Sequence, residues 1–163
     1  MAKSNISQST IMFTDIVGYS AMINKDQKHA LKLLDTHDQI IEPIISDYNG
    51  NIIKKIGDSI FAEFTDPQSS INTAIQIQTN LKSRNLISDK QDMIQIRIGL
   101  HMGDVIRKDD DLFGHDVNLC SRIESIAPKG GIAASNALIQ SINNKKISVR
   151  EMGYIKLKNI IHP

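Results

Sequence analysis

The chain contains a single cysteine, Cys120, among its 163 residues, so it cannot form an internal disulfide. This cysteine and the five histidines form no cluster with the spacing of a zinc site. The composition therefore suits a reducing, cytoplasmic compartment, and we expect no structural zinc. The N-terminus lacks the apolar core of a signal peptide, and no apolar run is long enough to cross a bilayer. We expect a soluble segment without direct membrane contact.

The sequence also lacks an excess of charge of either sign. Lys and Arg together number 19 and Asp and Glu 18, which gives a net charge of +1 at pH 7. This balance disfavours a protein that coats nucleic acid or adheres to an anionic membrane. Hydrophobic residues make up 40% of the chain, which is enough for a proper core. We therefore expect residues 1–163 to form a single globular domain.

Hydrophobic spacing and turn residues predict alternating strands and helices. The predicted strands are 10–15, 51–56, 59–64, 95–103, 104–108 and 132–134, with a last edge strand ending near Leu157. The predicted helices are a first one after Gly18, one from Ala30 that ends at Tyr48-Asn49-Gly50, and then 66–85, 114–125 and 135–142. The buried face of the third helix is expected to contain Ile71, Ala74, Ile75, Gln78 and Leu81.

Two pairings of strands follow from these boundaries. Gly57-Asp58 predicts a tight antiparallel hairpin between 51–56 and 59–64, and we expect 104–108 to pair with 95–103. The order strand, helix, strand, strand, helix, strand favours an α+β fold with helices covering a largely antiparallel sheet. A ferredoxin-like βαββαβ core has this order of elements.

Two aspartates lie at the ends of predicted strands. At Asp15 a carboxylate could hold a metal while backbone N–H groups of the following turn cradle phosphates, yet a single aspartate here is more often a helix N-cap. Asp58 has an ordinary alternative too, since Gly-Asp is common in hairpin turns. Together they are more informative. Two hard carboxylates at neighbouring strand ends suit two Mg²⁺ or Mn²⁺ ions and a triphosphate.

Other polar residues are ambiguous when each is taken alone. Asn118 and Arg122 lie four residues apart on a predicted helix, so they project from one face toward the same ligand, or simply into water. Lys54 has the ordinary alternative of a solvated strand lysine, and residues 109–111 that of a polar turn.

Four ordered segments carry a resemblance to a known family. Residues 13–20 have the sequence FTDIVGYS, residues 53–62 IKKIGDSIFA, residues 97–103 RIGLHMG and residues 113–122 FGHDVNLCSR. In this order they resemble the first and second metal motifs, the strand before the dimerisation hairpin and the transition-state helix of class III adenylate and guanylate cyclases. The resemblance covers nearly the whole chain.

The resemblance implies a role for each matching residue. Asp15 and Asp58 would coordinate two divalent cations, Mg²⁺ or Mn²⁺, with the Ile16 carbonyl as a further ligand. Asn118 would orient the ribose, and Arg122 would meet the charge that builds on the α-phosphate. The reaction implied is in-line attack of the ribose 3′-hydroxyl on the α-phosphorus of ATP, with pyrophosphate leaving. No side chain is an obvious general base, so the proton acceptor stays open.

Further residues match the family's substrate contacts. Lys54 and Asp111 match the purine-binding positions, and their chemistry selects adenine: lysine donates to the acceptor N1 and aspartate accepts from the exocyclic amine. Phe13 and Gly18, which flank the first metal aspartate, are also expected to bind substrate. Lys158 resembles a lysine that grips the outer phosphates, although Asn159 replaces the usual following glycine.

The resemblance also implies an assembly. In this family each site spans two protomers, so one sequence carrying both sets of residues implies a homodimer with two shared sites. The short segment 105–111 implies a trimmed dimerisation arm, and the end at Pro163 implies a catalytic region excised before its final strand from a longer, regulated chain, which could be membrane-tethered. The alternatives are a guanylate or dual-purine cyclase and a catalytically silent nucleotide-binding or dimerisation module.

Overall fold

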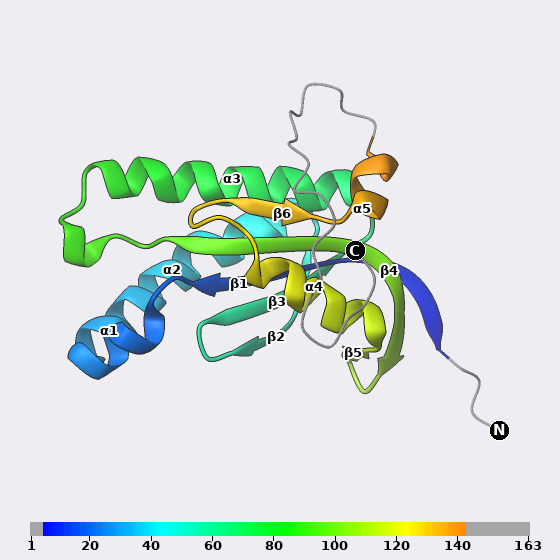
Figure 1. The fold of residues 1–163 in the computed structure, drawn as a ribbon, viewed down its shortest axis with the longest axis horizontal. Coiled ribbons are helices and arrows are strands. Elements are labelled where there is room, and N and C mark those ends of the chain that lie inside the picture. Colours follow the sequence, from blue (N-terminus) through cyan, green and yellow to red (C-terminus); the bar gives the residue numbers. More distant parts are fainter. Residues whose placement is uncertain (1–4, 143–163) are drawn as a thin grey trace.

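A computed structural model describes residues 5–142 (Figure 1). Its strands are β1 (Ile6–Ile16), β2 (Asn51–Ile56), β3 (Ser59–Phe64), β4 (Ile96–Lys108), β5 (Asp111–Phe113) and β6 (Ile132–Ala134). Its helices are α1 (Tyr19–Lys25), α2 (Gln27–Asp47), α3 (Pro67–Leu86), α4 (His115–Ser125) and α5 (Asn136–Ser141), with a 3₁₀ turn at Lys90–Asp92. Within the described part of the chain, no helix is both long and apolar enough to span a bilayer.

The strands form one sheet in the order β2-β3-β1-β4-β5, with β6 added parallel to β4. All other pairings are antiparallel, and β1 pairs with β4 along its whole length. The order β4-β1-β3-β2, with helices between β1 and β2 and between β3 and β4, is that of a ferredoxin-like βαββαβ core. The predicted α+β fold is therefore confirmed.

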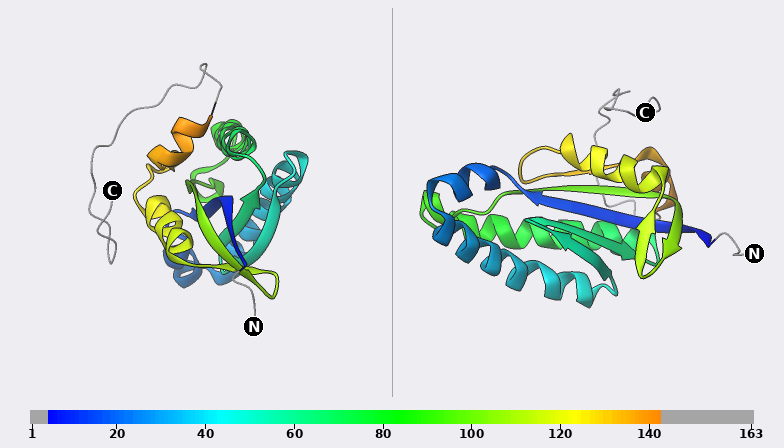
Figure 2. Two further views of the ribbon diagram at one scale, coloured as in Figure 1. Left: turned by 90° about the vertical axis from the view of Figure 1, so that its right-hand side faces the viewer. Right: turned by 90° about the horizontal axis from the view of Figure 1, so that it is seen from below.

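Helices cover the sheet from both sides (Figure 2). On one face, Ile96, Ile98 and Leu100 of β4 pack with the buried sides of α2 and α3 in the larger core cluster. On the other face, α4 lies against β4 and β1, and a second cluster includes Ile11 and Val117. Successive strand side chains point to opposite faces, so β1 and β4 contribute to both cores.

Local signals explain where the helices begin. The Asp26 side chain accepts a hydrogen bond from the His29 N–H and caps α2, and Asp66 caps α3 by accepting from the Ser69 N–H. Pro67 is the first residue of α3, where its missing N–H costs nothing. The predicted start of this helix at Asp66-Pro67 is thus confirmed.

Two sequence predictions about these elements were wrong. Residues 104–108 do not turn back onto 95–103 but continue β4, which pairs with β5 instead. The turn falls later, where Asp109 and Asp110 take positive φ angles of 51° and 61°. In α3, Ile75 is 41% exposed, whereas Ile77, which was not predicted, is fully buried. The buried stripe runs through Ala74, Ile77 and Leu81, and Ile75 lies on another side of the helix.

Helix α4 lies very close to the sheet because two glycines of β4 face it. A Cβ on Gly99 would stand 2.6 Å from the Cα of Glu124, and one on Gly103 would stand 2.7 Å from the Cβ of Asp116. Neither side chain could be added without displacing α4. The buried Cys120 lies at the same contact, with its Sγ 3.5 Å from the carbonyl oxygen of Gly99.

This close approach predicts a large effect of a single methyl group. Gly99→Ala should lower the free energy of unfolding by about 2–3 kcal/mol, since the new methyl group overlaps backbone atoms of Glu124 that have little room to move. Gly130→Ala is the matched control, because φ there is 73° but no atom lies within 4 Å of the new group, so only the roughly 1 kcal/mol cost of the left-handed backbone applies. Urea unfolding measures both, and equal losses would contradict the packing described.

Candidate active site

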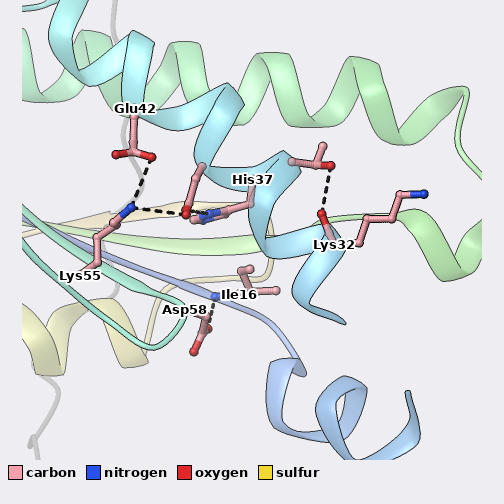
Figure 3. A network of polar contacts seen from close by, with 8 residues as sticks. Ile16, Lys32, His37, Glu42, Lys55 and Asp58 are labelled. Carbon is pink, nitrogen blue, oxygen red and sulfur yellow. Dashed lines mark hydrogen bonds and ion pairs between the residues drawn. The ribbon is translucent and has the colours of Figure 1, made fainter. Parts of the chain in front are cut away.

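The two predicted metal ligands lie next to each other at one end of the sheet. Asp15 is the penultimate residue of β1, and Asp58 lies in the turn between β2 and β3. The Ile16 N–H donates a hydrogen bond of 2.8 Å to Oδ2 of Asp58, which brings this carboxylate beside the residue that follows Asp15 (Figure 3). Gly57, at φ 59°, forms the tight turn that presents Asp58.

The atoms at this end of the sheet fit a hard divalent cation. Oδ1 of Asp15 is buried and has no hydrogen-bond partner among residues 5–142, an arrangement that is costly unless a cation or water completes it. No group of three or more His, Cys, Asp or Glu side chains among these residues could hold a metal. Asp15 and Asp58 are the predicted ligands that the structure brings to this end of the sheet, and the Ile16 carbonyl stays a prediction. Mg²⁺ is typically bound in this way, through one or two carboxylates plus substrate phosphates and water.

A third carboxyl group, which the sequence analysis missed, lies at the same place. Glu124 of α4 is only 5% exposed. Burial raises the pKa of its carboxyl, and the neighbouring negative charges of Asp15 and Asp58 raise it further, while Arg97 lowers it. A raised pKa favours the neutral form of Glu124, which lessens the negative charge beside Asp15 and Asp58. The signal was available, since Glu124 follows the apolar Val117 and Cys120 at helical spacing on the buried face.

The β2–β3 hairpin is fixed to α2 behind Asp58. Lys55 Nζ of β2 lies 3.5 Å from both Asp38 Oδ2 and Glu42 Oε2 of α2. Figure 3 shows the side chain of Lys55 pointing toward Glu42. Asp38 Oδ1 also lies 2.9 Å from His37 Nδ1, and since a carboxylate can only accept, Nδ1 carries the proton and donates. His37 is fully buried, and its Nε2 has no partner among the described residues. These contacts hold the turn that carries Asp58.

The predicted purine-binding residues meet although they lie on opposite edges of the sheet. Lys54 Nζ donates to Asp111 Oδ2 at 2.8 Å, which joins β2 to β5 because the sheet curls. This bond holds the pKa of the Asp111 carboxyl below its usual value, and the Leu112 N–H adds to the effect. The β2–β3 register is irregular between Ile52 and Lys54, and irregularities of this kind redirect the side chains beside them.

The structure describes all but one of the other predicted site residues. The Phe13 ring stacks on Phe61 with centroids 4.4 Å apart. Gly18 starts α1 at φ 75°, with no atom within 4 Å of where a Cβ would stand. Asn118 is exposed and Arg122 half-buried on the side of α4 opposite its buried stripe, so they share a face as predicted. Lys158 lies outside the described residues.

The sequence of the chain is similar to that of known enzymes. It matches the family model described as adenylate and guanylate cyclase catalytic domain over residues 1–161. It is 31% identical to a Rhizobium meliloti (strain 1021) protein named "Putative adenylate cyclase 3", over 100% of this chain and 28% of that protein. The chain spans about a third or less of the length of the curated relatives it matches.

The fold is similar to solved cyclase structures. An adenylate/guanylate cyclase/hydrolase from Silicibacter pomeroyi superposes with a TM-score of 0.89 at 30% identity, covering 99% of this chain and 95% of that one. The guanylate cyclase domain of RhGC from Catenaria anguillulae, solved in complex with GTP, superposes with a TM-score of 0.80 at 22% identity, covering 96% and 92%. The second match, at this identity, supports the fold alone.

The buried histidine behind the hairpin predicts a pH-dependent stability. Burial lowers the pKa of His37, although the hydrogen bond to Asp38 and the charges of Asp38, Asp58 and Glu42 oppose this. The unfolded chain therefore binds the proton more readily, so the free energy of unfolding falls as the pH drops from about 7.5 to about 5.5, by at most about 1.4 kcal/mol per pH unit from this group. His37→Gln should reduce the slope of Tm against pH.

The matched control for this change is His115→Gln, which removes an exposed histidine at the start of α4. Its slope of Tm against pH should equal that of the unmodified chain. A slope unaffected by His37→Gln would show that the buried ring does not titrate against folding.

Proposed function

Since the chain belongs to the family of adenylate and guanylate cyclase catalytic domains, we propose that it is an adenylate cyclase that converts ATP into 3′,5′-cyclic AMP and pyrophosphate. The observation that carries the choice of ATP is the contact of 2.8 Å between Lys54 and Asp111. It brings one donor and one acceptor together, and adenine needs both on its Watson–Crick edge. Guanine presents the opposite pattern there, with a donor N1 and an acceptor carbonyl.

Asp15, Asp58 and the Ile16 carbonyl hold the divalent cations in this proposal. Cyclase domains of this family generally depend on divalent metals, and the unpartnered Oδ1 of Asp15 supports a cation here. Two bound ions, Mg²⁺ or Mn²⁺, would favour ionisation of the ribose 3′-hydroxyl and neutralise the triphosphate. Gly18 leaves open space where the phosphates approach the N–H groups at the start of α1.

The remaining residues orient the nucleotide and stabilise developing charge. Asn118 positions the ribose so that its 3′-oxygen attacks the α-phosphorus in line while the bond to the β-phosphate oxygen breaks. Arg122 donates to the α-phosphate oxygens, whose negative charge grows in the transition state. Lys158 contacts the outer phosphates that leave as pyrophosphate. Phe13, stacked on Phe61, forms an apolar floor beside the metal carboxylates.

The proposal includes a homodimer with two shared sites. Within one chain Asn118 and Arg122 point away from the core, and no hydrogen bond or ion pair among residues 5–142 joins them to Asp15 or Asp58. An exposed apolar row supports association with a second copy. The row crosses β1, β4 and β5, where Ile6 pairs with Ile106 and Ile106 with Phe113, and these side chains are 57%, 44% and 46% exposed.

The longer relatives bear on regulation. Because the chain spans about a third or less of the curated proteins it matches, a regulatory domain elsewhere in the full protein is part of the proposal. A cytoplasmic location of the catalytic segment is also part of it.

The metal assignment predicts loss of activity without loss of fold. Asp15→Ala and Asp58→Ala should each lower cyclic AMP formation at least about a hundredfold, since each removes a carboxylate that offsets the charge of the bound ions. Asp47→Ala, an exposed change at the end of α2, is the matched control. Mass spectrometry identifies the product from ATP with Mg²⁺ or Mn²⁺ at several protein concentrations, and circular dichroism reports the fold.

Unchanged product formation by either aspartate variant would show that the metal assignment is wrong. Specific activity should rise with protein concentration if two copies complete each site. A specific activity independent of concentration, in a protein that is monomeric by light scattering, would exclude the shared site.

The base-recognition residues predict a change of substrate preference. Lys54→Glu should reduce kcat/KM for ATP relative to GTP by about tenfold or more, because the carboxylate cannot donate to N1 of adenine but can accept from N1 of guanine. Lys28→Glu makes the same charge change at an exposed position of α2 and should leave the ratio unchanged. An unmodified enzyme that clearly prefers GTP would refute the argument from Lys54 and Asp111.

A further inference from the structure

A histidine, an aspartate and a serine that have no role so far are hydrogen-bonded in a row. His101 of β4 contacts Ser135 Oγ through Nδ1 at 2.7 Å and Asp116 Oδ1 through Nε2 at 2.8 Å. His101 is only 5% exposed. We call these three residues the His101 bridge. It connects β4, which carries the ring, to the first turn of α4 and to the residue that precedes α5.

The direction of each hydrogen bond follows from the groups present. An ionised Asp116 can only accept, so Nε2 of His101 carries the proton and donates to Oδ1. In the neutral ring Nδ1 is then an acceptor, and the Ser135 hydroxyl donates to it. The Ser135 oxygen still accepts from the Leu138 N–H at 3.3 Å and caps α5. Every polar atom of the bridge thus has a defined partner.

The same three residue types form nucleophilic triads in hydrolases, but this set is not built for attack. The serine oxygen already binds two groups, and the ring is buried between strand and helix. A nucleophile needs an oxygen that a substrate can reach. The arrangement is instead that of a support for the elements it connects.

The bridge fixes the first turn of the helix that carries Asn118 and Arg122. Besides accepting from His101, the Asp116 carboxylate accepts from the Asp104 N–H through Oδ2 at 3.0 Å. It lies over Gly103, where there is no side chain to displace it. The two hydrogen bonds and this contact therefore attach the start of α4 to β4 and fix the rotation of the helix about its own axis. Successive residues of a helix keep a fixed angle of about 100° to one another. A small rotation of the first turn of α4 would therefore redirect the side chains that follow it along the helix.

From this geometry we infer that Asp116, His101 and Ser135 are positioning residues. They fix the orientation of the Arg122 side chain in the cyclisation step. The inference rests on the proposed function, in which Arg122 meets charge on the α-phosphate. Lys54 and Asp111 bind the base from β2 and β5, and the metal carboxylates lie on β1 and in the β2–β3 turn, so of the groups that bind substrate only Asn118 lies on the helix that the bridge attaches. Disturbing the bridge therefore lowers kcat much more than it changes KM.

Asp116→Asn tests this at one atom, since asparagine offers a single oxygen where the aspartate accepts two hydrogen bonds. It should lower kcat with ATP about tenfold while KM changes less than about twofold, as expected for a misaimed transition-state contact. Ser135→Ala should lower kcat in the same way, and Ser135→Thr, which keeps the hydroxyl, should restore it. Both serine variants leave α4 itself unaltered, so the test does not depend on the stability of Asp116→Asn.

A double-mutant cycle with Arg122→Ala separates an effect on the orientation of Arg122 from a general loss of stability of the protein. If Asp116 and Ser135 act through Arg122, their substitutions should lower kcat less than about twofold once Arg122 is absent. An equal loss of kcat in both backgrounds, or a rise of KM that accounts for the loss, would overturn the inference. If Arg122→Ala alone leaves kcat unchanged, the proposed role of Arg122 fails and the inference falls with it, so the single variant identifies which of the two has failed.

Discussion

The close approach of α4 to β4 is the constraint on which the geometry of the site depends. Gly99 and Gly103 leave the surface of β4 open, and α4 fills that space with the backbone of Glu124 and the side chain of Asp116. Packing at this distance fixes where both ends of the helix lie, because protein interiors have few voids into which a helix could shift. One end brings a carboxyl group to Asp15, and the other receives the hydrogen bond from His101. The face between them carries the exposed Asn118.

Negative charge is concentrated where β1 ends. Asp15, Asp58 and the buried Glu124 lie close enough for each aspartate to raise the pKa of Glu124. Carboxylates gathered in this way repel one another, so the arrangement costs stability unless protons or cations offset it. Arg97, which also bonds the Ala127 carbonyl, offsets part of it. The domain thus keeps an electrostatically unfavourable cluster at the place where the cations of the proposed reaction would bind, as functional sites often do.

The sequence predicted local structure better than long-range contacts. The hairpin at Gly57-Asp58 was predicted to the residue, because turn chemistry and strand alternation are local signals. The predicted strand was wrongly ended at Gly103, whereas β4 continues through this glycine, which makes room for Asp116. The contact between Lys54 and Asp111 depends on the curl of the sheet and lies beside a register irregularity, neither of which leaves a pattern in the sequence. His101 was missed because its partners Asp116 and Ser135 are distant in the chain, whereas the helical spacing of Glu124 could have revealed its burial.

The position of Lys54 and Lys55 has a consequence for the molecule as a whole. They lie on β2, an outer strand whose far edge has no partner strand among residues 5–142 and could there add a strand from another chain. Exposed lysines and a local irregularity of the strand are both devices by which natural sheets resist such uncontrolled pairing. Lys54, which contacts Asp111 at the opposite edge, and Lys55, which pairs with α2, therefore have a second effect. They oppose aggregation of the folded protein through this edge of the sheet.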